Sequence, residues 1–175
     1  MSPVEVATEC LDRIRHLQPS LNAFITVLPE KAMDEAKAAE LEIQKGHSKG
    51  VLHGVPIAVK DFYDTAGIPT TAAFEHFRAR MPSRDAASVE ILKKSGAILI
   101  GKTNMHTLGM GTTGLESCFG PVKNPWNQDY IPGGSSSGSA AAVASGMCYA
   151  TLDTDAIGSC GLPAVAWLVS NRHTA

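Results

Sequence analysis

Residues 132–146 read Pro132-Gly-Gly-Ser-Ser-Ser-Gly-Ser139-Ala-Ala-Ala-Val-Ala-Ser-Gly146, a glycine- and serine-rich turn followed by a run of small residues. The small residues predict a tightly packed helix, and the turn would present backbone N–H groups and hydroxyls at its N-terminus, where negative charge is favoured. Three functional interpretations fit: a phosphate cradle, a serine nucleophile elbow, or part of a larger array of hydroxyls and an amine. A flexible Gly/Ser linker is the fourth, and the apolar helix and strand-like segment that follow argue against it.

The segments on either side alternate between helix and strand patterns, which predicts an α/β fold with parallel pairing. Helices are expected at 3–18, 29–45, 86–95 and 162–169, and strands at 22–28, 55–61, 97–100 and 148–154. The first helix has a capping box at Ser2 and Glu5, and Pro19 is expected to end it. Residues 101–103 are expected to turn into a short helix near 104–108, and 155–159 to form a second turn.

The composition is that of a globular domain. The chain has 175 residues, of which 44% are hydrophobic and 18% charged, so one domain with a buried core is expected over residues 1–175. A net charge of −2 gives no electrostatic case for nucleic acid or an anionic membrane. No apolar run approaches the ~20 residues that span a bilayer, and the N-terminus lacks the pattern of a signal peptide, so the cytoplasm is the expected location.

The four cysteines and six histidines show no ligand spacing. There is no C-x-x-C pair and no H-x-x-x-H motif, which argues against a zinc site or a disulfide framework. We therefore expect no metal and no cofactor, and we interpret the cysteines as buried free thiols.

The strand expected at 55–61 ends in two charged residues, Lys60 and Asp61. Because side chains alternate along a strand, these two point to opposite faces, so Asp61 need not be the ion-pair partner of Lys60. A lysine at the end of an apolar strand is either a buried functional amine or a surface lysine whose stem snorkels to water.

Two of the three interpretations of the serine-rich turn lack supporting residues. Gly134 to Gly138 matches the G-x-S-x-G elbow with Ser136 as nucleophile, but the segment before it ends in Pro132 and only His173 follows. The phosphate cradle lacks the Lys and Ser/Thr of a Walker loop. Gly96 and Gly101-Lys-Thr103 have the spacing of a P-loop, but residues 97–100 between them are expected to form a strand, so a nucleotide site is not expected here.

Four ordered motifs support the third interpretation. They are Gly54-Val-Pro-Ile-Ala-Val-Lys60-Asp61, Asn124-Pro-Trp-Asn127, Pro132-Gly-Gly-Ser135-Ser136 with Ala142-Val-Ala144, and Asp155 with Gly158-Ser159 and Pro163-Ala164. Together they resemble the amidase signature family over nearly the whole chain. The resemblance implies that family's fold, a mixed and largely parallel central sheet flanked by helices.

The resemblance also implies a Ser–cis-Ser–Lys triad. In it Ser159 is the nucleophile, Ser135 the bridging serine after a cis bond from Gly134, and Lys60 the base. Ser136 and Asp155 take supporting positions. The backbone N–H groups of Ala156, Ile157, Gly158 and Ser159 are implied to form the oxyanion hole.

The implied chemistry is consistent with the residues around Lys60. An ordinary lysine, with a pKa of ~10.4, is almost entirely charged at pH 7, so a basic Lys60 needs its pKa lowered, and burial is the usual cause. The apolar strand 55–59 supplies a dry setting. Ser135 can relay a proton because a hydroxyl donates and accepts at once.

The implied substrate is a small amide such as glutamine or another carboxamide, cleaved through an acyl-enzyme. Two assignments stay open: a free-standing amidase, or the glutaminase subunit of a tRNA-dependent amidotransferase with its partner subunits. Members of the family continue well beyond the length of this chain, so we expect a C-terminally truncated, incomplete domain. The alternative function is an inactive remnant that acts as an interaction module.

Two positions depart from the family pattern. Ile157 stands where the family carries a glycine, and a β-branched residue would be strained if the turn needs positive φ there. Gly161 stands where the family tends to carry an arginine, which would leave Asp155 without that partner.

Overall fold

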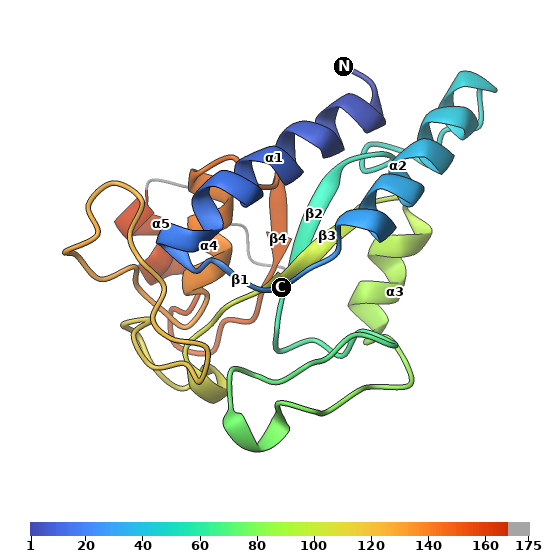
Figure 1. The fold of residues 1–175 in the computed structure, drawn as a ribbon. Helices are drawn as coiled ribbons and strands as arrows, with labels where there is room; N and C mark the ends of the chain where they lie inside the picture. Colours follow the sequence, from blue (N-terminus) through green and yellow to red (C-terminus); the bar gives the residue numbers. More distant parts are fainter. Residues whose placement is uncertain (168–175) are drawn as a thin grey trace.

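A computed structural model of the chain describes residues 1–167 (Figure 1). The helices are α1 (Pro3–Leu21), α2 (Pro29–Gln44), α3 (Ala87–Lys94), α4 (Ser137–Ala144) and α5 (Gly161–Trp167), with short 3-10 turns at Glu75–Phe77 and Thr107–Gly109. The strands are β1 (Phe24–Val27), β2 (Pro56–Lys60), β3 (Ile98–Thr103) and β4 (Ala150–Leu152). The last helix was expected to reach residue 169, and its last two positions lie outside the described residues.

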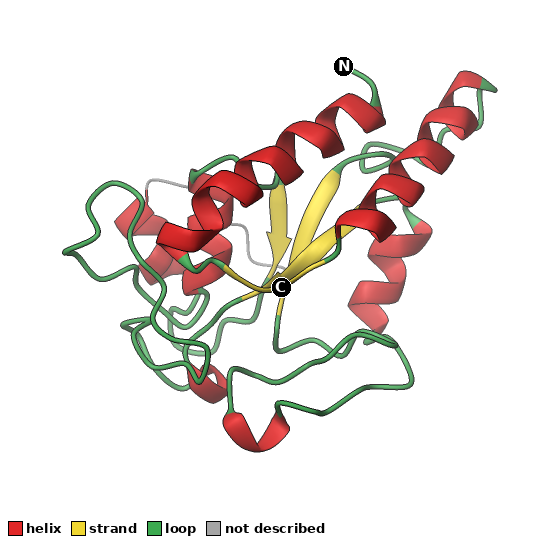
Figure 2. Ribbon diagram, viewed as in Figure 1, coloured by secondary structure: helices red, strands yellow, loops and turns green. Residues whose placement is uncertain are grey.

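The four strands form one sheet in the order β1-β3-β2-β4. β2 pairs in parallel with both β3 and β4, whereas β1 pairs antiparallel with β3. Figure 2 shows the strands in the middle of the molecule with helices around them. The expectation of a mixed, largely parallel sheet flanked by helices is therefore confirmed.

The two faces of the sheet are covered by different helices. Ala58, Ile98 and Ile100 belong to a core formed with α1, α2 and α4, in which small residues such as Ala32 and Ala141 allow close approach. Val59 and Leu99, one step along each strand, pack instead with Val89 of α3 and Ile68. Figure 1 shows α1 and α2 running side by side over the first face. The alternation of side chains along β2 thus decides which face each residue serves.

Some elements are shorter than expected: β4 covers Ala150–Leu152 of the expected 148–154, and the short helix expected near 104–108 is the 3-10 turn at Thr107–Gly109. Two further boundaries differ from the sequence expectation for a clear physical reason. Pro19 lies inside α1, which continues to Leu21 and ends at Asn22 in the left-handed conformation. A proline so near the end removes only one hydrogen bond of the helix, so the last turn still forms. The capping box of Ser2 and Glu5 is present as expected.

The second wrong boundary is at residues 101–103, which continue β3 and do not form a turn. Gly101 lies between β1 and β2, and a Cβ at this position would lie 2.5 Å from the carbonyl oxygen of Thr26. The glycine is therefore a site of close strand approach rather than a turn signal. In the part of the chain that the structure describes, no helix has the length and apolar character needed to cross a membrane.

Candidate active site

The candidate site lies where β2 and β4 end. Lys60 is the last residue of β2, and the turn 153–159 follows β4, its parallel neighbour. The serine-rich turn comes to the same place because it precedes α4, which packs on these strands. The C-terminal ends of neighbouring parallel strands are a common place for ligand sites in α/β folds.

Lys60 is buried completely, and oxygen atoms surround its amine. Nζ donates to Ser135 Oγ at 2.7 Å and to Ser136 Oγ at 2.9 Å. It also donates to Thr154, to Oγ1 at 3.0 Å and to the carbonyl oxygen at 3.4 Å. The structure thus excludes the interpretation of Lys60 as a snorkelling surface residue.

The surroundings of Lys60 favour its neutral form. Burial lowers the pKa of the amine, and Asp153, Cys160 and Asp155 oppose this effect by their charge without cancelling it. The partners within hydrogen-bond distance are hydroxyl and carbonyl oxygens, which accept from a neutral amine as well as from an ammonium. An amine in this setting is suited to accept a proton.

The serine-rich turn is buried and tightly packed. The Gly134–Ser135 peptide bond is cis, as the family resemblance implies. A Cβ on Gly134 would lie 2.8 Å from the Gly111 carbonyl oxygen, so this position has room only for glycine. The Ser135 carbonyl accepts from the backbone N–H of His106 at 3.0 Å. Ser135 is therefore held by its backbone on one side and by Lys60 on the other.

The second turn is tied to the first by one backbone hydrogen bond, from Ser136 N to the Ser159 carbonyl at 3.2 Å. Ser159 is 5% exposed and lies beside the serine-rich turn. Within residues 1–167, no hydrogen bond joins the Ser159 hydroxyl to Ser135 or Lys60. The structure brings Lys60, Ser135 and Ser136 into direct contact and places the Ser159 backbone next to them.

Asp155 occupies part of the implied oxyanion hole. Its Oδ1 accepts from the N–H groups of Gly158 at 2.6 Å and Ser159 at 2.9 Å. Its Oδ2 accepts from Cys160 at 2.8 Å and Gly161 at 3.4 Å. Two of the four implied donors are therefore already bonded. The N–H groups of Ala156 and Ile157 make no hydrogen bond to the rest of the described chain.

The same contacts replace the absent arginine. Burial raises the pKa of the Asp155 carboxyl, but the hydrogen bonds from four backbone N–H groups outweigh it and hold the pKa below its ordinary value. A carboxylate that accepts several backbone N–H groups is stabilised in its charged form. Asp155 therefore has partners even though Gly161 stands in the arginine position.

The strain expected at Ile157 is absent. Positive φ falls on Gly158, at 111°, where glycine tolerates it, whereas Ile157 is not among the positive-φ residues. The Ile157 side chain is 80% exposed. This departure from the family pattern leaves the backbone of the turn intact.

Sequence reasoning missed a second buried lysine, Lys102, at the end of β3. Its Nζ lies 3.1 Å from Asp61 Oδ1 and donates to Thr70 Oγ1 at 2.9 Å and to the Tyr63 carbonyl at 3.0 Å. Asp61 also accepts from the N–H and hydroxyl of Thr71. The expectation that Lys60 and Asp61 face opposite ways is therefore confirmed, and Asp61 has its own cation.

Thr154 and Cys160 were also missed. Thr154 directly precedes Asp155, and the parallel pairing of β2 with β4 was the signal that could have placed it beside Lys60. Cys160 is half-buried, its Sγ lies 3.6 Å from the Thr154 carbonyl, and burial raises the pKa of its thiol to about 11. It is a neutral thiol at the edge of the site.

The nucleophile-elbow interpretation of Ser136 does not fit the structure. No strand leads into the turn, because residues 121–133 are irregular. An elbow needs a strand immediately before the serine. Its remaining histidine, His173, lies outside the described residues.

Comparison with known proteins gives consistent matches. The family model described as Amidase matches residues 5–167. The A subunit of the glutamyl-tRNA(Gln) amidotransferase of Geobacter metallireducens is 46% identical over 164 residues, and that of Lawsonia intracellularis 48% over 160 residues. These matches cover 94% and 91% of this chain. A crystal structure described as an amidase superposes with a TM-score of 0.85 over 94% of this chain, at 38% identity.

The same matches cover much less of the other proteins. The chain spans 34% and 33% of the two amidotransferase relatives and 37% of the amidase in the crystal structure. The expectation that the chain corresponds to only part of the length of its relatives is confirmed.

Proposed function

The chain belongs to the amidase family, and on that premise we propose that Lys60, Ser135 and Ser159 form a triad that cleaves a carboxamide C–N bond. The observation that carries the proposal is the 2.7 Å hydrogen bond from Lys60 Nζ to Ser135 Oγ, made by an amine that is completely buried. A serine hydroxyl needs an adjacent base to attack an amide carbonyl.

In the proposed reaction the Ser159 oxygen attacks the carbonyl carbon and gives its proton to Ser135 Oγ. Ser135 passes its own proton to the neutral amine of Lys60. The protons return in the opposite order to the leaving nitrogen as the C–N bond breaks, which leaves an ester on Ser159. Water then attacks the ester by the same relay and releases the carboxylic acid.

The second turn adds two points to this scheme. The backbone of Ser159 is held beside the serine-rich turn by its hydrogen bond from Ser136, so in the proposed reaction a rotation about χ1 of Ser159 brings its hydroxyl to Ser135. Because Gly158 and Ser159 donate to Asp155, the proposed oxyanion donors are the N–H groups of Ala156 and Ile157.

The proposed substrate is a small amide such as glutamine or another carboxamide. The names of the two relatives support the assignment to a tRNA-dependent amidotransferase that works with partner subunits, and a free-standing amidase is the alternative. Because the chain spans about a third of these relatives, both assignments concern the whole protein. We propose that residues 1–175 form one incomplete domain of it.

The test is covalent labelling with a fluorophosphonate, which reacts with an activated serine. We expect the wild-type chain to be labelled on Ser159 and Ser159→Ala to lose that labelling, because it removes the labelled oxygen. Lys60→Ala should slow labelling at least about 100-fold, the scale of one acid–base catalyst. Ser145→Ala, a change at the end of α4, is the matched control and should label like wild type. Labelling that survives in Ser159→Ala would rule out the assignment.

One observation favours the second candidate, an inactive remnant that acts as an interaction module. Asp155 already holds the N–H groups of Gly158 and Ser159. A folded chain with a cooperative unfolding transition and no labelling at any pH would support this candidate over the enzyme.

A further inference from the structure

Asp153 follows β4 directly and is not used by the proposed triad. The register of β2 and β4 pairs Ile57 with Ala150 and Val59 with Leu152, so one further step puts Asp153 beside Lys60. The Tyr63 hydroxyl donates to the Asp153 carbonyl at 2.6 Å. The backbone of Asp153 is thus fixed against the residues that follow β2.

The Asp153 carboxylate lacks the hydrogen bonds that a buried oxygen normally has. Its Oδ1 is buried and makes no hydrogen bond with any described residue. Buried carboxylate oxygens are normally hydrogen-bonded or compensated by a nearby cation. The strand register places Lys60 next to Asp153, although no ion pair within 4.0 Å joins these two described residues. Burial lowers the pKa of Lys60, and Asp153 opposes this lowering more than any other group does.

The other charged or titratable groups that act on Lys60 are Cys160 and Asp155. Cys160 is neutral at pH 7, because burial raises its pKa to about 11. The Asp155 carboxylate is already satisfied by four backbone N–H groups. Asp153 is therefore the negative charge that remains for Lys60.

We propose that Asp153 is a positioning residue whose carboxylate is the counter-ion of the Lys60 ammonium, so that it sets the pH above which Lys60 becomes a base. The proposal rests on the proposed function and adds a regulation of the same site. Raising the pH removes the Lys60 proton and switches on the serine relay.

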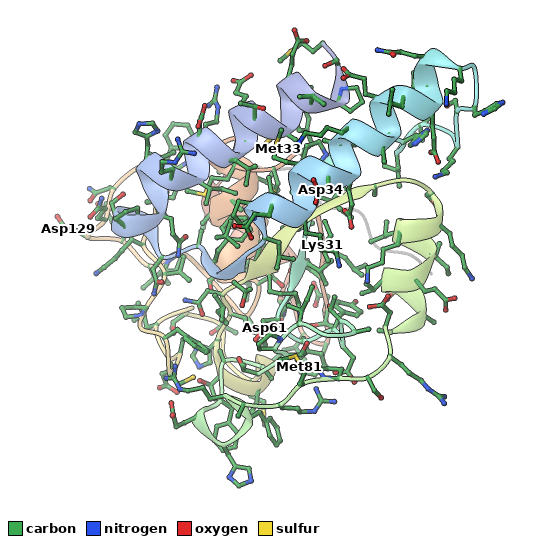
Figure 3. All side chains as sticks on the ribbon, turned by 45° about the vertical axis from the view of Figure 1, so that its right-hand side comes forward. Lys31, Met33, Asp34, Asp61, Met81 and Asp129 are labelled. Atoms are coloured by element: carbon green, nitrogen blue, oxygen red, sulfur yellow. The ribbon has the colours of Figure 1, made fainter. Side chains whose placement is uncertain are left out.

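The test measures the rate of fluorophosphonate labelling from about pH 6 to about pH 10, together with the titration of the Lys60 side chain by carbon-13 NMR. The NMR signal is assigned by its absence in Lys60→Met. The variants are Asp153→Asn, which keeps the shape and removes the charge, and Tyr63→Phe, which loosens the backbone and keeps the charge. Asp129→Asn is the charge-matched control, on an exposed loop at the edge of the molecule (Figure 3).

In Asp153→Asn we expect both midpoints to move to lower pH, with labelling at pH 7 about tenfold faster, the effect of removing one nearby opposite charge. Tyr63→Phe and Asp129→Asn should keep the wild-type midpoints. Asp153→Asn midpoints equal to those of Asp129→Asn, or moved upward, would overturn the proposal. If the wild-type chain is not labelled at any pH, the proposed function fails, and the NMR midpoint alone decides whether Asp153 is the counter-ion.

Discussion

Lys60 and Lys102 stand at the C-terminal ends of neighbouring parallel strands and are both completely buried, yet different groups hold them. Lys102 lies 3.1 Å from the Asp61 carboxylate, whereas Lys60 donates to the oxygens of Ser135, Ser136 and Thr154. Burial lowers the pKa of both amines, and only Lys102 has a carboxylate in direct contact to oppose it. The difference teaches that burial alone does not separate a structural cation from a candidate base. What separates them is whether the amine contacts a carboxylate, as Lys102 does, or only hydroxyl and carbonyl oxygens, as Lys60 does.

The largest effect that this comparison predicts is on stability, at Lys102. Lys102→Met removes the cation from Asp61 and leaves a buried carboxylate uncompensated, which costs about 3–5 kcal/mol of the free energy of unfolding. Chemical denaturation measures it.

Lys94→Met is the control, because Lys94 pairs with Glu90 on the surface of α3, with side chains 73% and 56% exposed. A surface pair contributes about 0–1 kcal/mol. Equal losses in the two variants would mean that Asp61 and Lys102 do not act as a buried pair.

A smaller effect is expected at Thr154, which holds Lys60 through Oγ1 at 3.0 Å. Thr154→Val keeps the side-chain shape but removes this acceptor, and should lower the free energy of unfolding by about 1–2 kcal/mol. The matched control is Thr151→Val, on β4 itself, where the hydroxyl makes no hydrogen bond to any described residue. If both variants lose the same stability, the Thr154 hydroxyl does not support Lys60.

The sequence could predict the arrangement around Lys60 because its signals are local or ordered along the chain. The apolar run 55–59 identifies β2, its alternation separates Lys60 from Asp61, and the resemblance pairs Lys60 with Ser135 and predicts the cis bond. All four strands were expected within a few residues of where they are found, since hydrophobic periodicity reports which residues face the core. The largest difference is at β3, which continues to Thr103 beyond its expected end at residue 100.

Lys102 and the contacts of Asp155 could not be predicted in this way. Gly101 resembles a turn signal until β1 and β2 are known to lie on either side of it, and only the paired sheet extends β3 to Lys102. The carboxylate of Asp155 reaches four N–H groups because the chain turns at Gly158 with positive φ. Both features depend on three-dimensional neighbours that no single segment specifies.

The last prediction concerns the pH dependence of stability at Lys60. Lys60→Met replaces an amine of lowered pKa by an apolar side chain of similar length and removes its hydrogen bonds to Ser135, Ser136 and Thr154, so the informative quantity is the slope of stability against pH and not the stability at pH 7. A lysine whose folded pKa lies below its ordinary 10.5 binds fewer protons when folded, so wild-type stability rises with pH through the window that ends near 10.5. Lys60→Met should flatten that rise, while other titrating groups contribute equally to both proteins. Urea denaturation at a series of pH values measures the difference, and parallel curves would mean that folded Lys60 keeps an ordinary pKa and is not the base.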